Sequence, residues 1–291
     1  MFGIKLWSRF AVFRDPLTIT QNLTFPIPPK TTIGGMLAAV LGIEYKDYFA
    51  DETYFNFGYS LVLQKPIRKR SFAQNYVADY THKSETRHNA MKEFAIATSR
   101  YAKLVNERNQ LESKKLLNDK EKKKLNNIEG KISDQKNKLT AKQKAAFEKN
   151  KAGFVEPKPI YREILLSPEY LIFIKNFKYE EKAITFLQNH YSEFQLYMGN
   201  SEFAANYTFI ECTGKPDELK ILDSFTAHPD QVMFEAGKKY TNIFAATKTT
   251  GDREYRDYRN LVFSDSKLNL NDPVNGLIVT TGSEEYCCEF I

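Results

Sequence analysis

A short basic segment followed by aromatic residues carries the residue types that bind nucleic acid. The segment KPIRKR and the aromatic residues after it supply Lys65, Arg68, Lys69, Arg70, Phe72 and Tyr76. Cations neutralise phosphates and aromatic faces stack on unpaired bases, so the pattern is typical of an RNA-binding patch. The alternative is a solvated charge run beside core aromatic residues, which is the commoner meaning of such a run.

The start of an apolar helix expected over 33–41 is a second candidate site. Three prolines precede it, Thr31 or Thr32 is the expected N-cap, and Gly42 is the expected stop. The first turn of such a helix offers free N–H groups and the positive end of a dipole, which suit a phosphate. Glycines there either admit an RNA backbone or let the helix pack tightly on a sheet. The candidate residues are Lys30, Thr31, Thr32, Gly34 and Gly35.

The loop MGNSEF, residues 198–203, is a third candidate. Gly199, Asn200 and Ser201 offer backbone N–H and side-chain donors, and glycine tolerates a positive φ. Glu202 is a poor phosphate partner and is expected to hold the loop through hydrogen bonds. The alternative is a plain turn between a helix and a strand.

Metal-independent RNA cleavage is the enzymatic alternative. It needs a base for the 2′-hydroxyl and an acid or cation for the leaving group, and Tyr76, His82 and Lys83 have these chemistries. Solvent exposure in a polar stretch that leads into the helical insertion is the commoner explanation of such residues. The sequence has no P-loop, no strand-linked GxGxxG and no zinc-ligand spacing, so we expect no cofactor and no metal.

The positive charge is concentrated in one part of the chain. Of the net charge of +6, residues 100–151 hold 16 Lys and Arg against 7 Asp and Glu, a net of +9, which leaves −3 for the rest. The basic pI alone therefore says little about nucleic acid. With no signal peptide or apolar span, the cytoplasm and no membrane contact are expected. The three cysteines predict buried thiols rather than disulfides.

The order of elements predicts an α+β fold. A strand is expected over residues 4–12, a second over 57–63, others over 160–166, 170–174 and 207–212, and a helix over 180–194. Between them, leucines and isoleucines at heptad-like spacing predict a coiled-coil-like helical hairpin that turns at Asn118 and Asp119. We expect a ferredoxin-like, RRM-like domain from residues 1–90 and 155–213, a Lys-rich helical insertion over 91–154, and a C-terminal β region over 214–291.

Three stretches together resemble the CRISPR-associated Cas five family of the repeat-associated (RAMP) superfamily. They are FPIPPKTTIGGMLAAVLG at 25–42, REIL at 162–165 with Pro168 and YLI at 170–172, and LYMGNSEF at 196–203. The overall pattern is similar to the type I-B group. The resemblance covers about residues 1–80 and 155–215, and the Lys-rich insertion departs from it.

The resemblance implies a non-catalytic subunit of a type I Cascade surveillance complex. Such a subunit holds the 5′ handle of the CRISPR RNA (crRNA) and contacts the backbone and large subunits, with target DNA as a further possible partner. Arg162, in the second stretch, joins the expected RNA contacts on this basis. In the I-C group the same subunit cuts the repeat, which keeps the endoribonuclease alternative open. A third alternative is a scaffold whose coiled coil binds protein.

Overall fold

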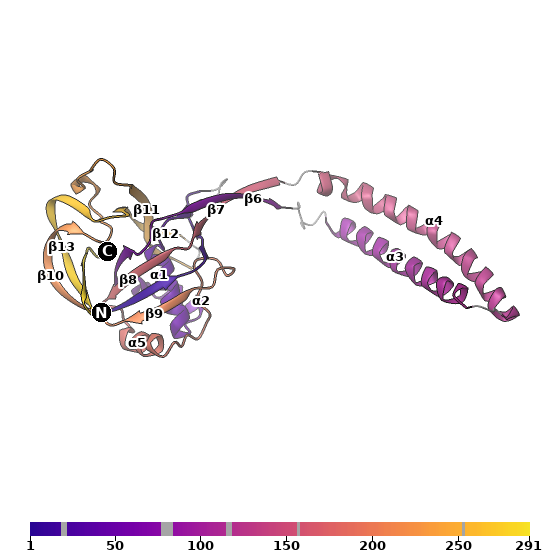
Figure 1. The fold of residues 1–291 in the computed structure, drawn as a ribbon, viewed down its shortest axis with the longest axis horizontal. Coiled ribbons are helices and arrows are strands. Elements are labelled where there is room, and N and C mark those ends of the chain that lie inside the picture. The colour runs from indigo at the N-terminus through magenta and orange to yellow at the C-terminus, as the bar shows by residue number, and fades with distance from the viewer. Residues whose placement is uncertain (19–21, 77–83, 115–117, 156–157, 252–253) are drawn as a thin grey trace. The chain divides into compact units, whose positions relative to one another are not determined.

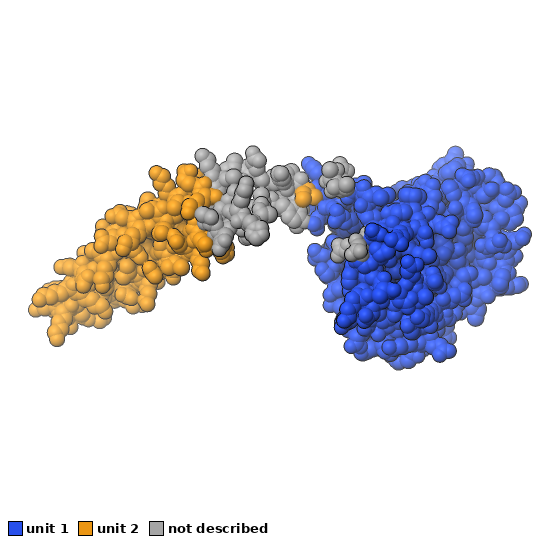
Figure 2. Space-filling view, turned by 180° about the vertical axis from the view of Figure 1, so that it is seen from behind, with its two compact units in different colours: residues 1–73, 161–291 blue, residues 74–160 orange. Residues whose placement is uncertain are grey.

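The computed structural model describes residues 1–18, 22–76, 84–114, 118–155, 158–251 and 254–291. The chain divides into two compact units, residues 1–73 with 161–291 and residues 74–160 (Figure 2). The mixed helix and sheet content confirms an α+β protein.

The first unit is built on a four-stranded antiparallel sheet (Figure 1). Its strands are β1 (Phe2–Trp7), β5 (Gly58–Leu63), β8 (Glu169–Lys175) and β9 (Asn206–Ile210), in the order β5-β8-β1-β9. The five residues from Tyr170 to Ile174 in β8 are all buried, so this strand is covered on both faces.

Helices α1 (Lys30–Leu41) and α5 (Glu180–Gln188) cover one face of this sheet, and α2 (Tyr45–Ala50) follows α1. Gly42 ends α1 with φ +73°, which confirms the predicted stop. The predicted threonine N-cap is wrong. Pro29 is the N-cap and α1 begins at Lys30, because the proline ring fixes the backbone angle at which a helix starts.

The helix expected over 180–194 is shorter than predicted. It ends at Gln188, and His190 adopts a left-handed conformation with φ +51° that a helix cannot continue. Tyr191, within the expected range of the helix, lies beyond its end and is exposed.

The C-terminal region covers the other face of the sheet. Its strands β10 (Thr213–Leu222), β13 (Leu268–Thr281) and β14 (Glu284–Cys288) form one sheet, and β11 (Tyr240–Thr249) pairs with β12 (Tyr255–Ser264). Leu171 and Phe173 of β8 pack against Val279 and Cys288. The four-stranded sheet consequently has no open face for RNA.

The strand expected over 4–12 is broken. After β1 the chain forms β2 (Phe10–Ala11), which pairs with β7 (Lys158–Leu166), and β3 (Phe13–Arg14), which pairs with β4 (Thr24–Phe25). Strand β6 (Lys69–Tyr76) completes a sheet of order β2-β7-β6. Two 3-10 turns, η1 (Glu52–Phe55) and η2 (Pro229–Gln231), complete the unit.

The second unit is a helical hairpin of α3 (Ser84–Glu112) and α4 (Asp119–Val155), which lie side by side (Figure 1). The ion pair Glu93–Lys142 joins the two helices, and Lys114, two residues after the end of α3, pairs with Glu121 in the first turn of α4. The two helices are therefore antiparallel, as predicted. Asn118 and Glu121 cap α4 reciprocally, each side chain accepting the backbone N–H of the other.

Candidate nucleic-acid interface

The first face of the interface is a cleft beside α1. It has a volume of about 300 Å³ and is lined by Thr32, Gly35, Met36, Ala39, Gln195, Leu196, Tyr197 and Gly199. The structure thus brings two predicted candidates, the α1 start and the MGNSEF loop, to one cleft. Gln195 and Tyr197 were not predicted, because only the folded loop shows that they face α1.

The two glycines of α1 have different roles. A Cβ on Gly34 would lie 2.6 Å from the Tyr48 hydroxyl and 3.3 Å from the Phe55 ring, so this glycine serves close packing. A Cβ on Gly35 would meet nothing within 4 Å. Gly35 is therefore not needed for packing, and its missing side chain leaves open space on the α1 side of the cleft.

Lys30 is buried, although the sequence predicts it as a phosphate contact. Its ammonium donates to the Ile291 carbonyl at 3.2 Å and lies 5.1 Å from the centre of the Phe57 ring. Burial, and then the charges of Lys248 and Arg259, lower the pKa of Lys30 to about 8. Thr31 and Thr32, which follow it, are half-buried at an α1 start that has no side-chain cap bond.

The MGNSEF loop is fixed by backbone hydrogen bonds. Met198 N–H donates to Phe203 O at 2.7 Å, and Phe203 N–H donates to Asn200 O at 3.0 Å. Gly199 has φ +91°, and a Cβ there would lie 1.7 Å from Val12 O. Backbone bonds and this glycine close the loop, while Glu202, predicted to do so, is exposed, as is Ser201.

The second face is a basic cleft of about 330 Å³ lined by Lys65, Pro66, Arg68, Leu166 and Ser167. Lys65 contacts the Glu169 carboxylate at 2.5 Å, and Lys5 contacts the same carboxylate at 2.7 Å. These two bonds lower the pKa of Glu169. Ser167, which was not among the predicted candidates, has φ +47° in the turn before Pro168.

The predicted basic segment divides into paired and available cations. Lys69 donates to the Thr24 carbonyl at 2.6 Å and to Glu163 at 3.1 Å, so its charge is already matched. Arg68 and Arg70 are exposed, and within the described part of the chain neither forms an ion pair. The available charge is therefore that of the two arginines.

Strand β6 presents an aromatic side chain beside one of these arginines. Arg70 and Phe72 are two residues apart, so their side chains share one face of the strand, and Phe72 is 38% exposed. Tyr76 ends the strand, but its side chain lies outside the described residues, as do His82 and Lys83. Arg162 is half-buried in β7, where its backbone forms an isolated parallel β-bridge with Asn22.

Hairpin β11–β12 carries a further group of cations and rings. Phe244 and Tyr258 stack with centroids 4.8 Å apart and planes at 19°. Arg256 pairs with Glu254 at 2.7 Å, while Arg259 is exposed. This hairpin adds aromatic surface to the unit.

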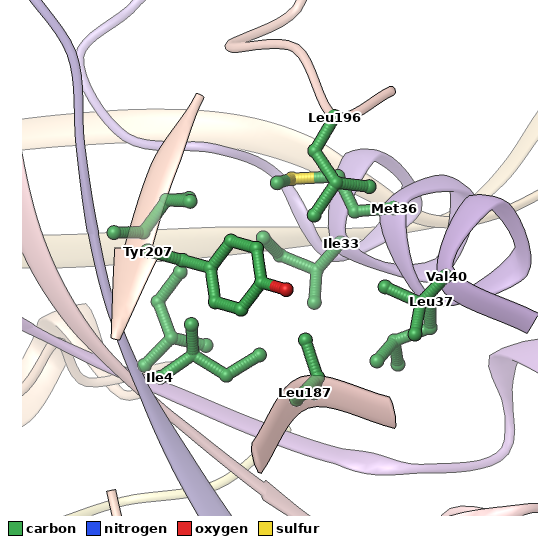
Figure 3. Close-up of a pocket in the computed structure, with 10 residues that line it drawn as sticks. Ile4, Ile33, Met36, Leu37, Val40, Leu187, Leu196 and Tyr207 are labelled. Atoms are coloured by element: carbon green, nitrogen blue, oxygen red, sulfur yellow. The ribbon is translucent and has the colours of Figure 1, made fainter. Parts of the chain in front are cut away.

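A small void in the core is a packing feature and not a binding site (Figure 3). It measures about 20 Å³, and the side chains that line it are apolar except for the hydroxyl-bearing Tyr207. Figure 3 shows the Tyr207 ring reaching in among Ile33, Leu187 and Leu196. The buried hydroxyl has no hydrogen-bond partner among the described residues, and burial raises the pKa of Tyr207.

Neither a metal cluster nor a membrane helix is present in the described part of the chain. No group of three or more His, Cys, Asp or Glu side chains there could hold a metal ion. No helix there has both the length and the apolar character needed to span a membrane.

Residues 3–144 match the family model described as CRISPR-associated protein (Cas_Cas5), which confirms the resemblance predicted from the sequence. No curated protein matches the chain.

Among solved structures, a chain of a "CRISPR RNA-guided surveillance complex" is 10% identical, with a TM-score of 0.43, over 92% of this chain and 90% of that chain. A "Crystal Structure of CRISPR-associated Protein" is 10% identical with a TM-score of 0.34 over the same shares. A chain of the "Type III-B Cmr-beta bound to cognate target RNA and AMPPnP" is 14% identical with a TM-score of 0.38, over 92% and 86%.

Proposed function

Residues 3–144 carry the sequence pattern of the Cas5 family of CRISPR-associated proteins, and from that premise we propose a non-catalytic crRNA-binding subunit of a CRISPR effector complex. Its ligand is the 5′ handle of the crRNA. The observation that carries the proposal is the cleft beside α1, where the start of the helix and the Gly199 loop, far apart in the sequence, lie together.

The described contacts support a division of labour within the site. Gly35 leaves space for a close approach of the RNA backbone, whereas Gly199 lets the loop pack closely against Val12 O. The α1 start supplies the N–H groups of Lys30 and Thr31 for a phosphate, since those of Thr32 and Ile33 donate to Pro29 O. Arg68 and Arg70 supply unpaired positive charge, with Phe72 as a surface for stacking. Lys65 and Lys69 hold carboxylates and so shape the site rather than bind RNA.

We infer that the core of the first unit is a ferredoxin-like domain of the RAMP type. The sheet order β5-β8-β1-β9, with α1 between β1 and β5 and α5 between β8 and β9, supports this assignment. The covered sheet faces favour RNA binding at the clefts and strand edges instead of on the open sheet used by RRM domains. A type I-B-like complex, with backbone and large subunits as partners, belongs to the same proposal.

Binding is tested with purified protein and end-labelled repeat RNA that contains the 5′ handle. Arg68→Gln with Arg70→Gln is expected to weaken binding at least tenfold and to reduce its salt dependence. The matched control is Lys215→Gln with Lys220→Gln, which removes the same charge from exposed positions of β10 and should leave affinity within twofold. Equal weakening by both pairs, or by neither, contradicts the proposed site.

Catalysis is tested in the same mixture on a denaturing gel without added metal. The proposal predicts shifted but intact RNA. A discrete product that disappears with His82→Ala would replace the binding function with the endoribonuclease alternative.

A further inference from the structure

The helical hairpin of the second unit has a one-sided distribution of charge. With 3.6 residues per turn, Lys124, Lys131 and Lys138 follow one line along α4, about 10.5 Å apart. The same flank also carries Lys120, Lys142 and Lys149. All six are exposed, and we call them the lysine stripe. From Lys120 to Lys149 the stripe runs for about 43 Å.

The stripe is not explained by the packing of the hairpin. Ala90, Ala97, Leu111, Ile128 and Ala146 are buried in the seam between the helices. The stripe lies to one side of that seam, and Lys142 alone of its members forms an ion pair across the described hairpin, at 2.5 Å from Glu93.

Acidic residues lie beside some members of the stripe, because Glu93 interacts electrostatically with Lys149 as well as Lys142, and Glu121 with Lys124. Glu121 pairs with Lys114 of the connection between the helices, and Asp134 lies at the edge of the flank. The opposite flank is mixed, because Glu129 lies between Lys122 and Lys136 in the same heptad register. Six like charges on one flank repel one another by a small amount each, which a polyanion along the flank would reverse.

We propose that the lysine stripe binds the phosphate backbone of a nucleic-acid duplex without regard to sequence. Lysine is a compact point charge and lacks the planar fork with which arginine reads base edges. The flank has no aromatic side chain, and Phe147, the exposed ring of α4, lies on another side, so stacking on single-stranded bases is not provided. A straight row of cations without side chains that recognise base edges suits the phosphates of a duplex. This surface is separate in the chain from the proposed handle-binding site.

The test uses the full chain with Lys124→Gln, Lys131→Gln and Lys138→Gln together. The matched control is Lys122→Gln, Lys136→Gln and Lys144→Gln, which removes the same charge from the opposite flank of the same helix. Anisotropy is measured with a labelled DNA duplex, an RNA duplex and the single-stranded handle RNA over a salt series. Circular dichroism verifies that both variants remain helical.

The stripe variant is expected to bind duplex at least tenfold more weakly, with the slope of log K against log salt reduced by about 2–3, while the control stays within twofold. Handle binding should be unchanged, which separates this proposal from the function proposed above. The DNA and RNA arms identify which duplex is held. The proposal is overturned if the stripe variant and the control variant lose equal duplex affinity, or if the stripe variant loses as much affinity for single-stranded RNA as for duplex. If duplex binding is unchanged and only the stripe variant leaves its effector complex, the stripe holds a protein and the proposal fails.

Discussion

Replacing Gly35 separates the folding of α1 from its proposed role in binding. Gly35 lies inside a 12-residue helix, and a Cβ there would meet nothing within 4 Å. Alanine costs less backbone entropy than glycine in a helix interior, so Gly35→Ala should stabilise the protein by about 0.5–1 kcal/mol. Gly35→Leu should fold as well but fill part of the 300 Å³ cleft, and RNA affinity should fall at least fivefold.

Urea unfolding and handle-RNA anisotropy measure the two effects on the same samples. Gly34→Ala is the control in which the same added methyl group has no room, because its Cβ would lie 2.6 Å from the Tyr48 hydroxyl. Overpacking of this kind costs about 1–3 kcal/mol, which exceeds the helix gain. A destabilised Gly35→Ala would refute the open environment of residue 35. Unchanged RNA binding by Gly35→Leu would refute the cleft as a binding surface.

Three further substitutions test other parts of the first unit. Gly199→Ala should destabilise the protein by more than about 2 kcal/mol in urea unfolding, because a positive φ is strained for alanine and the Cβ collides with Val12 O; near wild-type stability would contradict this geometry. Tyr207→Phe should raise the free energy of unfolding by about 1 kcal/mol, since it removes a buried hydroxyl without a partner, and a loss would mean that the hydroxyl is satisfied. The pKa of Lys30, lowered to about 8, means that the unfolded chain binds the proton more tightly, so stability should increase as pH rises from 8 towards 10.5. Lys30→Met should remove that slope when the two proteins are unfolded at pH 7, 8, 9 and 10, and parallel curves would contradict it.

Local signals in the sequence were sufficient for several elements. Gly42 stops α1 because glycine is the residue that takes the left-handed C-cap without strain. The hairpin of α3 and α4 follows from apolar residues at helical spacing, which any stable helix must bury. The strands over 160–166 and 170–174 likewise follow from apolar runs of strand length, and in β8 the run is continuous because both faces of the strand are buried.

The errors arise where contacts between distant residues decide the outcome. Lys69 looks like a free phosphate contact in the sequence, yet strand pairing brings Glu163 and the Thr24 carbonyl to it. Lys30 looks exposed before a helix, yet its ammonium donates to the carbonyl of Ile291, beyond the last strand. Such pairings join residues from 45 to 261 positions apart, and no periodicity reports them.

The covered sheet explains why the candidate residues gather where they do. A four-stranded sheet with helices on one face and a second sheet on the other has only its rims and connections left for a ligand. The α1 start, the Gly199 loop and the basic segment before β6 are all connections of this kind, and two of them line one cleft. The N–H groups of Thr32, Met198 and Phe203 are bonded within these connections, and the backbone N–H groups that are not bonded there can serve phosphates. A charged polymer bound at these rims would then be held mainly by backbone and arginine contacts, and its affinity should fall steeply with salt.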